Sequence, residues 1–308
     1  MIRTLRATDL FRVLLDGKAI GPDWAQTWER LGTQPGSSLG PSAVARGLML
    51  NRKGERYSVS TEGMHLRALA STKARSGPRA WEVQRLSLST ETSEDGVELL
   101  ERLCMMAGQQ GAERVFLRLS TSSPVVDVAK QAGFLLFTSE ALYRLDIPPS
   151  GLSTSNRYIR PSMSFDEYGV FRLYCACAPA KVKAAYGLTF DEWRDARESP
   201  RVEERQGVYE SQGCPRGWVR VTSHRRVASH MEVMLHPDEK SEVWEDLVAW
   251  GLQQGSPGSL FVAPVPEYQQ PLASILEACG FAFVQECQLM VKSIAVRVNE
   301  SALAPAGA

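Results

Sequence analysis

The chain has 308 residues, of which 44% are hydrophobic and 23% are charged, and this composition is typical of an ordinary soluble globular protein. Its 35 basic residues balance 35 acidic residues, so no overall field attracts the chain to nucleic acid or to an anionic membrane. The length predicts two domains of about 150 residues each.

The N-terminal sequence, MIRTLRATDL, is charged and lacks the apolar run of a signal peptide. No later window approaches the roughly 18 uninterrupted apolar residues of a membrane helix. We therefore expect a cytoplasmic protein that binds neither membranes nor nucleic acid. The six cysteines are scattered and none lies at a zinc-ligand spacing from a histidine, so we expect free thiols and no metal site.

The hydrophobic pattern predicts a similar order of elements twice. In the first half we predict strands at residues 2–6, 56–60, 65–72, 80–88, 114–120 and 134–145, and helices at residues 9–16, 23–31, 93–109 and 123–132. In the second half we predict strands at residues 158–160, 207–211, 218–222, 229–235, 259–263 and 281–291, and helices at residues 165–177, 189–197, 238–253 and 271–279. Strands that are first antiparallel and later separated by helices predict an α/β chain, with a mixed sheet and helices on both faces.

Two segments of the chain have similar sequences. Residues 123–145 read SPVVDVAKQAGFLLFTSEALYRL, and residues 270–292 read QPLASILEACGFAFVQECQLMVK. Gly280 lies 147 residues after Gly133 (280 minus 133), and the same offset aligns the flanking residues without a gap. Each glycine follows a predicted helix, where we expect it to form a left-handed cap.

We interpret this similarity as a tandem duplication. The predicted domains are residues 1–147 and 157–298, joined by a linker rich in Pro, Ser and Gly at residues 148–156 and followed by a flexible tail at residues 299–308. We expect the two halves to pack on each other.

The element order resembles that of the GNAT acyltransferase superfamily. The resemblance is carried by GVELLERLCMMAGQQGAERVFLRLSTSSPVVDVAKQAGF at residues 96–134 and by its weaker echo at residues 243–281. It implies two tandem GNAT-like acyl-CoA N-acyltransferase domains. It also implies acetyl-CoA or another acyl-CoA as cofactor, and a small-molecule or peptide amine as acceptor.

In that family a turn of the form Arg/Gln-x-x-Gly-x-Gly/Ala joins the fourth strand to the next helix and holds the coenzyme A pyrophosphate with its backbone amides. The first half has Glu91 and Glu94 at the Arg and first Gly positions and keeps only Gly96. The cofactor-binding residues that the resemblance implies in this half are Leu88, Thr90, Ser93 and Gly96.

The second half lacks glycine throughout residues 238–250, and Val243 or Trp244 falls where the family has Gly or Ala. A side chain there would block the approach of a phosphate. We therefore expect no coenzyme A in this half, and we expect Asp238 to cap the helix instead.

The candidate catalytic residues are Glu82, Glu232 and His230. A general base in this family is often a carboxylate on the fourth strand, and Glu82 and Glu232 occupy such strands. His230 and Glu232 lie on one face of their strand, so both can point into a cleft, although a solvated strand face fits the same pattern. The family's frequent general acid, a tyrosine, is replaced by Ala129 and Leu276.

Two functions stay open. The first is an acyl-CoA-dependent N-acetyltransferase with degenerate cofactor loops, in which the half that carries Gly96 is the better candidate. The second is a non-catalytic binding or assembly module, in which each helix start is closed by its own side chains. Transfer of an aminoacyl group from a nucleic-acid carrier is disfavoured, because the chain is neutral and lacks a basic stripe.

Overall fold

A computed structural model describes residues 2–6, 9, 21–32, 54–88, 94–148, 159–198, 203–224, 228–256 and 258–294. Its strands are β1 (Ile2–Thr4), β2 (Glu55–Glu62), β3 (His65–Ala74), β4 (Ala80–Leu88), β5 (Arg114–Ser120), β6 (Leu135–Leu145), β7 (Ile159–Pro161), β8 (Glu203–Ser211), β9 (Cys214–His224), β10 (Ala228–Leu235), β11 (Leu260–Pro266) and β12 (Ala282–Ser293). Its α-helices are α3 (Glu94–Gly108), α4 (Val126–Gln131), α5 (Glu167–Cys177), α6 (Ala180–Tyr186), α7 (Phe190–Ala196), α8 (Glu242–Gln254) and α9 (Pro271–Ala278). Short 3-10 turns are η1 (Trp28–Arg30), η3 (Ser164–Asp166) and η4 (Glu267–Gln269).

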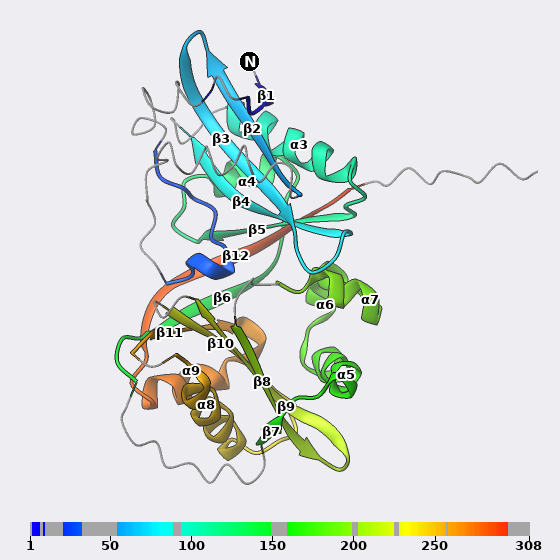
Figure 1. Cartoon of the computed structure of the whole chain (residues 1–308), viewed down its shortest axis with the longest axis vertical. Coiled ribbons are helices and arrows are strands. Elements are labelled where there is room, and N and C mark those ends of the chain that lie inside the picture. Colours follow the sequence, from blue (N-terminus) through cyan, green and yellow to red (C-terminus); the bar gives the residue numbers. More distant parts are fainter. Residues whose placement is uncertain are drawn as a thin grey trace, which may run out of the picture.

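All twelve of these strands form one mixed sheet, in the order β1-β2-β3-β4-β5-β12-β6-β11-β10-β9-β8-β7 (Figure 1). The five strands at each end come from one half of the chain. At the centre, the last strands of the two halves have exchanged places: β12 pairs with β5, β6 pairs with β11, and β12 and β6 pair with each other, all antiparallel. The expected packing of the two halves therefore takes the form of one shared sheet.

The two halves repeat the same helix ending. Gly133 and Gly280 have φ angles of +82° and +89°, which confirms the left-handed caps. In each half the phenylalanine after the glycine donates its N–H over 3.0 Å to a carbonyl five residues earlier in the chain. This agreement at an offset of 147 residues (280 minus 133) supports the interpretation as a duplication. The domain boundaries stay predictions, because residues 149–158 and 295–308 lie outside the described residues.

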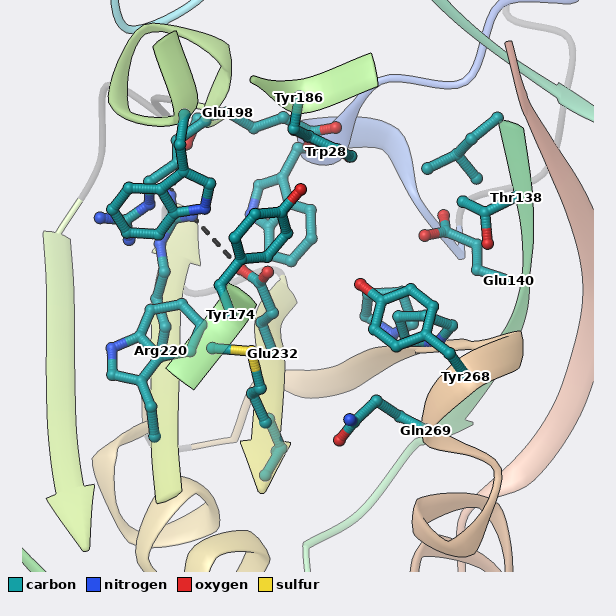
Figure 2. Close-up of a pocket in the computed structure, with 18 of the residues that line it drawn as sticks. Trp28, Thr138, Glu140, Tyr174, Tyr186, Glu198, Arg220, Glu232, Tyr268 and Gln269 are labelled. Carbon is teal, nitrogen blue, oxygen red and sulfur yellow. Dashed lines mark hydrogen bonds and ion pairs between the residues drawn. The ribbon is translucent and has the colours of Figure 1, made fainter. Parts of the chain in front are cut away.

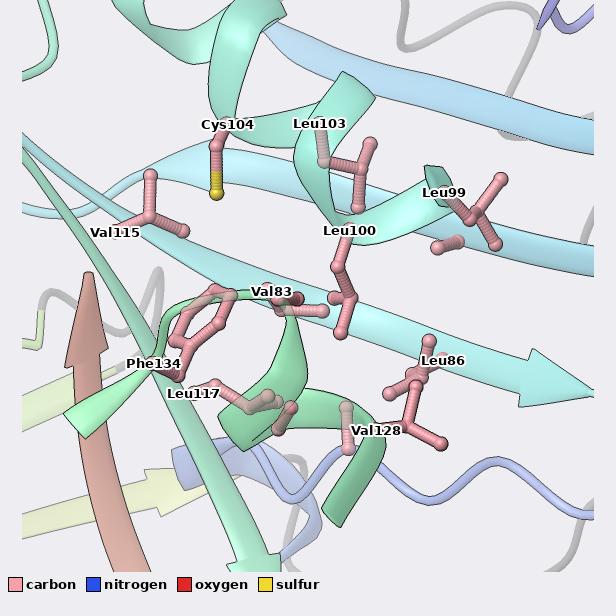
Figure 3. Close-up of a cluster of buried hydrophobic side chains, with 14 of the residues drawn as sticks. Val83, Leu86, Leu99, Leu100, Leu103, Cys104, Val115, Leu117, Val128 and Phe134 are labelled. Atoms are coloured by element: carbon pink, nitrogen blue, oxygen red, sulfur yellow. The ribbon is translucent and has the colours of Figure 1, made fainter. Parts of the chain in front are cut away.

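Helices cover both faces of the sheet. Helices α3 and α4 pack on one face of the β2–β5 region, where buried side chains of α3 such as Leu100 and Leu103 meet Val83 and Leu86 of β4 (Figure 3). Helices α8 and α9 pack with the inner residues of β9–β11 in a second core. Helices α5–α7 cover the opposite face and form a third core, which contains Phe116 of β5 together with residues of β9 and β10. The largest part of the lining of the candidate site comes from this third core and the strands beneath it.

Two local predictions are wrong. The helix expected at residues 23–31 is absent: Asp23 forms a β-bridge with Ser87, residues 24–27 carry no helical assignment, and only η1 is helical. Helix α8 begins at Glu242. The side chain of the residue before it, Ser241, accepts no capping hydrogen bond. Asp238 lies before this helix, and its carboxylate is 3.6 Å from the Arg216 guanidinium. The predicted helix at residues 9–16 lies outside the described residues except for residue 9.

Candidate functional site in the sheet centre

Each half of the sheet contains one parallel pair of strands that soon separates. Strands β4 and β5 are paired from Ala80 opposite Arg114 to Glu82 opposite Phe116. Strands β10 and β11 are paired over three residues in the same way. Beyond these pairs the strands diverge, so backbone N–H and C=O groups face a gap where an extended chain can pair with them.

The gap between β4 and β5 is filled by the protein itself. The N–H of Trp24 donates to the carbonyl of Leu86 on β4, and the N–H of Gln26 donates to the carbonyl of Arg118 on β5, both over 2.9 Å. The Leu86 N–H donates to Asp23 Oδ1, also over 2.9 Å. The segment of residues 23–26 therefore satisfies both strand edges, and an extended ligand finds no free edge there.

Two of the four cofactor-binding residues expected in the first half, Leu88 and Gly96, pack against other parts of the protein. Leu88 is only 3% exposed. A Cβ atom on Gly96 would lie 2.8 Å from Val128 Cγ1 of α4 and 3.0 Å from Leu88 Cδ1, so this glycine lets α3 approach its neighbours closely. Thr90 and Ser93 lie outside the described residues. Gly96 thus permits a close approach of α3 to α4 and β4, not to a ligand.

The gap between β10 and β11 opens instead onto a cavity. This cavity is partly open to solvent and lies between the sheet and helices α5–α7 (Figure 2). Strand β10 contributes Glu232, Val233 and Met234 to its lining, and β11 contributes Pro264 and Pro266.

Alternate backbone amides of β10 face this gap. The Leu235 N–H donates over 3.3 Å to Oε1 of Gln269, which follows β11, whereas the next N–H, that of His236, donates to Arg216 beside β9. Because amides alternate along a strand, the Val233 N–H shares the gap-facing edge with Leu235. Val233 lies 147 residues after Leu86 (233 minus 86) and is its counterpart in the repeat. In the first gap the Leu86 N–H donates to Asp23.

Aromatic side chains form much of the cavity wall. They are Trp28, Tyr174, Tyr186, Trp193, Trp218 and Tyr268. Burial raises the pKa of the Tyr268 phenol well above its ordinary value, so this residue stays protonated. Tyr268 and Glu140 both line the cavity, and Figure 2 shows them on the same side of it. The site thus presents a neutral O–H donor and a carboxyl group to the same space.

A buried charge network underlies this wall. The guanidinium of Arg118 is 2.7 Å from Glu140 and 2.8 Å from Glu198. The guanidinium of Arg75 is 3.3 Å from Glu198 and 3.1 Å from Glu82. Three carboxylates therefore share two guanidinium groups, and the network has one negative charge in excess when all of them are ionised.

Burial and the neighbouring charges shift the pKa of the three carboxyl groups in this network. Burial, reinforced by Glu198 and Glu232 and opposed by Arg118, raises the pKa of Glu140 to about 7. Burial also raises the pKa of Glu82, against the effect of Arg75. Burial opposes the ionisation of Glu198, but its two arginine partners outweigh it and lower its pKa. Glu140 can therefore exchange a proton near neutral pH.

The structure separates the three catalytic candidates. Glu232 lines the cavity, and its carboxylate is 3.4 Å from the Arg220 guanidinium. Glu82 belongs to the buried network beside Arg75 and is absent from the cavity lining. His230 is 1% exposed and packs against Trp28 with 5.6 Å between ring centroids, so Glu232 reaches the cavity and His230 does not.

Sequence reasoning missed Glu140. It lies on β6, the last strand of the first half, and reaches the site of the second half only because β6 pairs with β11. The signal was present: Glu140 is the one acidic residue in the strand sequence LLFTSEALYRL. A buried carboxylate in such a strand needs charged or hydrogen-bonding partners.

Among the described residues, no group of three or more His, Cys, Asp or Glu side chains is placed to hold a metal ion. None of the helices in the described ranges has the length and apolar character that a membrane crossing requires.

Comparison with solved structures identifies the fold as that of GNAT acetyltransferases. A GCN5-related N-acetyltransferase from Sphaerobacter thermophilus matches with a TM-score of 0.54 and 14% identity, over 95% of each chain. A tandem GNAT protein from the clavulanic acid biosynthesis pathway, in a structure without AcCoA, matches with a TM-score of 0.52 and 12% identity, over 95% of this chain and 98% of that one. No family model and no curated protein sequence matches the chain. The likeness at this level of identity is one of fold.

Proposed function

We propose that the protein is an acyl-CoA-dependent N-acyltransferase with one working site, where the β10–β11 gap opens onto the cavity. The observation that carries this proposal is the placement of the Val233 edge, Glu140 and Tyr268 around one space, while the other gap is filled. This reverses the preference for the first half that Gly96 suggested, and with it the expectation that the second half binds no coenzyme A.

The second gap fits one part of the cofactor. The pantetheine arm of an acyl-CoA carries amides in an extended chain and is suited to pair with a strand edge such as that of Val233. The start of α8 offers no glycine turn for the phosphates, and Glu239 there is 2.9 Å from Arg216. We therefore expect weak binding, in which the arm contributes more than the phosphates.

The residues of the cavity suit attack by an amine. When bound, an acyl-CoA supplies an activated acyl thioester. The Val233 N–H can donate to the carbonyl oxygen, where negative charge develops during attack. Ionised Glu140 can take the proton that the amine loses, and Tyr268 can donate a hydrogen bond to the leaving sulfur. The amide bond forms as the carbon–sulfur bond breaks, and the proton from the amine balances the one that the free thiol requires.

The proposal is tested by measuring the binding of millimolar acetyl-CoA, both through the stabilisation seen in thermal unfolding and by calorimetry. A ligand at 100 times its dissociation constant stabilises a protein by about 2.7 kcal/mol. Pro266→Trp places a large side chain at the end of β11 and is expected to abolish the stabilisation. Ser120→Trp, at the corresponding end of β5, is the matched control and should retain it. Loss of binding in the Ser120 variant alone would instead assign the cofactor to the first half.

A second candidate is a non-catalytic ligand-binding module. It is favoured by the filled first gap and by Gln269, whose side chain spans the outer end of the second gap. A wild-type protein that shows neither acetyl-CoA binding nor turnover of any amine would support this candidate and reject the acyltransferase.

A further inference from the structure

Arg197 differs from the other arginines around the cavity. It follows α7, and its guanidinium lies 5.1 Å from the ring centroid of Trp193 and 5.3 Å from that of Trp218. Among the described residues, no carboxylate lies within ion-pair distance of this guanidinium. Arg118 and Arg220, by contrast, each have two carboxylate partners.

Two carboxylates around Arg197, that of the next residue in the chain and Glu204, are already paired, whereas the charges of Glu232 and Glu167 also act on Arg197. Glu198 is bound by Arg75 and Arg118, and Glu204 is 3.2 Å from Arg220. The two indole rings stabilise the cation of Arg197 by cation–π interaction, but they offer no acceptor to its N–H groups. A planar guanidinium with unused donors is well suited to bind a carboxylate with two parallel hydrogen bonds.

The cavity also has negative groups for a cation. Glu232 lines it with a side chain that is 41% exposed, so its carboxylate keeps open positions besides the contact with Arg220. Glu140 lines it as well. Tyr174 and Tyr268 add aromatic faces that suit both an apolar body and an ammonium group. One cavity therefore combines an anion-binding group, cation-binding groups and apolar walls.

We propose that the acceptor in this cavity is a free amino acid with an apolar side chain, whose carboxylate binds Arg197 and whose amine faces Glu232 and Glu140. The assignment rests on the proposed acyltransferase for the fate of the amine. The binding of the amino acid itself needs no cofactor and can be measured separately.

Calorimetric titration without cofactor tests the assignment. The probes are L-phenylalanine and L-leucine, each compared with its primary amide and with the amine that lacks the carboxyl group. We expect the amino acids to bind at least about tenfold more tightly than either analogue, because hydrogen bonds between two charged groups are stronger than those to a neutral group. Equal affinity within each set, or no binding by any probe, would overturn the proposal. Phosphonate analogues of the two amino acids form a further arm, and tighter binding of these than of the carboxylates would reject a carboxylate ligand.

Two variants locate the effect. Arg197→Gln should bring the amino acids down to the affinity of their amides and leave the amides unchanged. Arg194→Gln removes an exposed arginine of the same helix, 2.8 Å from Asp191, and should leave the tenfold preference intact. A preference that persists in the Arg197 variant would contradict the assignment, and the comparison of ligands on the wild type decides the question if that variant does not fold. Binding with this preference but without acetyl-CoA turnover would reject the enzyme and retain the amino acid site.

Discussion

Glu140 of β6 and Cys287 of β12 lie opposite each other where the two halves exchange their last strands. They are 147 residues apart (287 minus 140), so the repeat offset relates each to the other, and the local twofold axis of the sheet passes between them. The first half contributes a carboxyl group at this point and the second half a thiol. The central site is thus asymmetric in chemistry although the strands around it are symmetric.

We expect Glu140→Gln to lower kcat/KM for amine acylation by about 100-fold or more, because a general base contributes roughly that much. The wild-type rate should rise with pH with a midpoint of about 7, since Glu140 must be ionised to accept a proton. Steady-state rates from pH 5 to 9 measure both effects. An unchanged pH profile in the variant would assign the proton transfer to another group.

The same substitution should change how stability depends on pH. The pKa of Glu140 is raised from 4.5 to about 7, so the folded protein binds more protons than the unfolded chain between these values. Its stabilising contribution is complete below pH 4.5 and is lost as the pH rises through 7, by up to about 3 kcal/mol. The unfolding free energy of Glu140→Gln minus that of the wild type should therefore be more favourable to the variant at pH 8 than at pH 5. Urea unfolding at both values measures this, with the exposed Glu98→Gln as a control that should show no such trend.

Asp23→Ala should destabilise the protein by about 2–4 kcal/mol, because it leaves two buried N–H groups unsatisfied. Asp23 Oδ1 accepts from Leu86 at 2.9 Å and from Ala25 at 3.2 Å, and its other oxygen is paired with Arg30. Chemical unfolding gives the value. Glu29→Ala alters an exposed carboxylate in the same turn and should cost less than about 0.5 kcal/mol. Similar losses in both variants would show that the segment in the first gap is not held by Asp23.

Gly96→Ala should cost about 1–3 kcal/mol in spite of the better helix propensity of alanine, because the new methyl group overlaps Val128 and Leu88. The cost should be smaller in a Val128→Ala background, where space for the methyl group has been made. A double-mutant cycle of unfolding free energies measures this coupling. Additive losses would mean that Gly96 is required for another reason.

Local patterns in the sequence were sufficient for much of the fold. Strands at residues 80–88 and 114–120 have the predicted bounds, because turn residues flank short runs rich in residues that favour strands. The glycine caps at residues 133 and 280 and the order of elements indicated the GNAT fold, which the structural comparison confirms. These features depend on interactions between residues that are close in sequence.

Tertiary structure decided the exchange of β6 and β12, the filled first gap and the place of Glu140. Residues 23–31 have an amphipathic pattern that predicts a helix, yet Trp24 and Gln26 donate to β4 and β5, whose open edges offer better partners than a short helix. Glu140 is the one acidic residue of its own strand, but it became a site residue only through pairing with the strand that contains Pro266. Pairing between strands more than 100 residues apart depends on which edges remain free once the sheet is assembled, and that information is not contained in any local pattern.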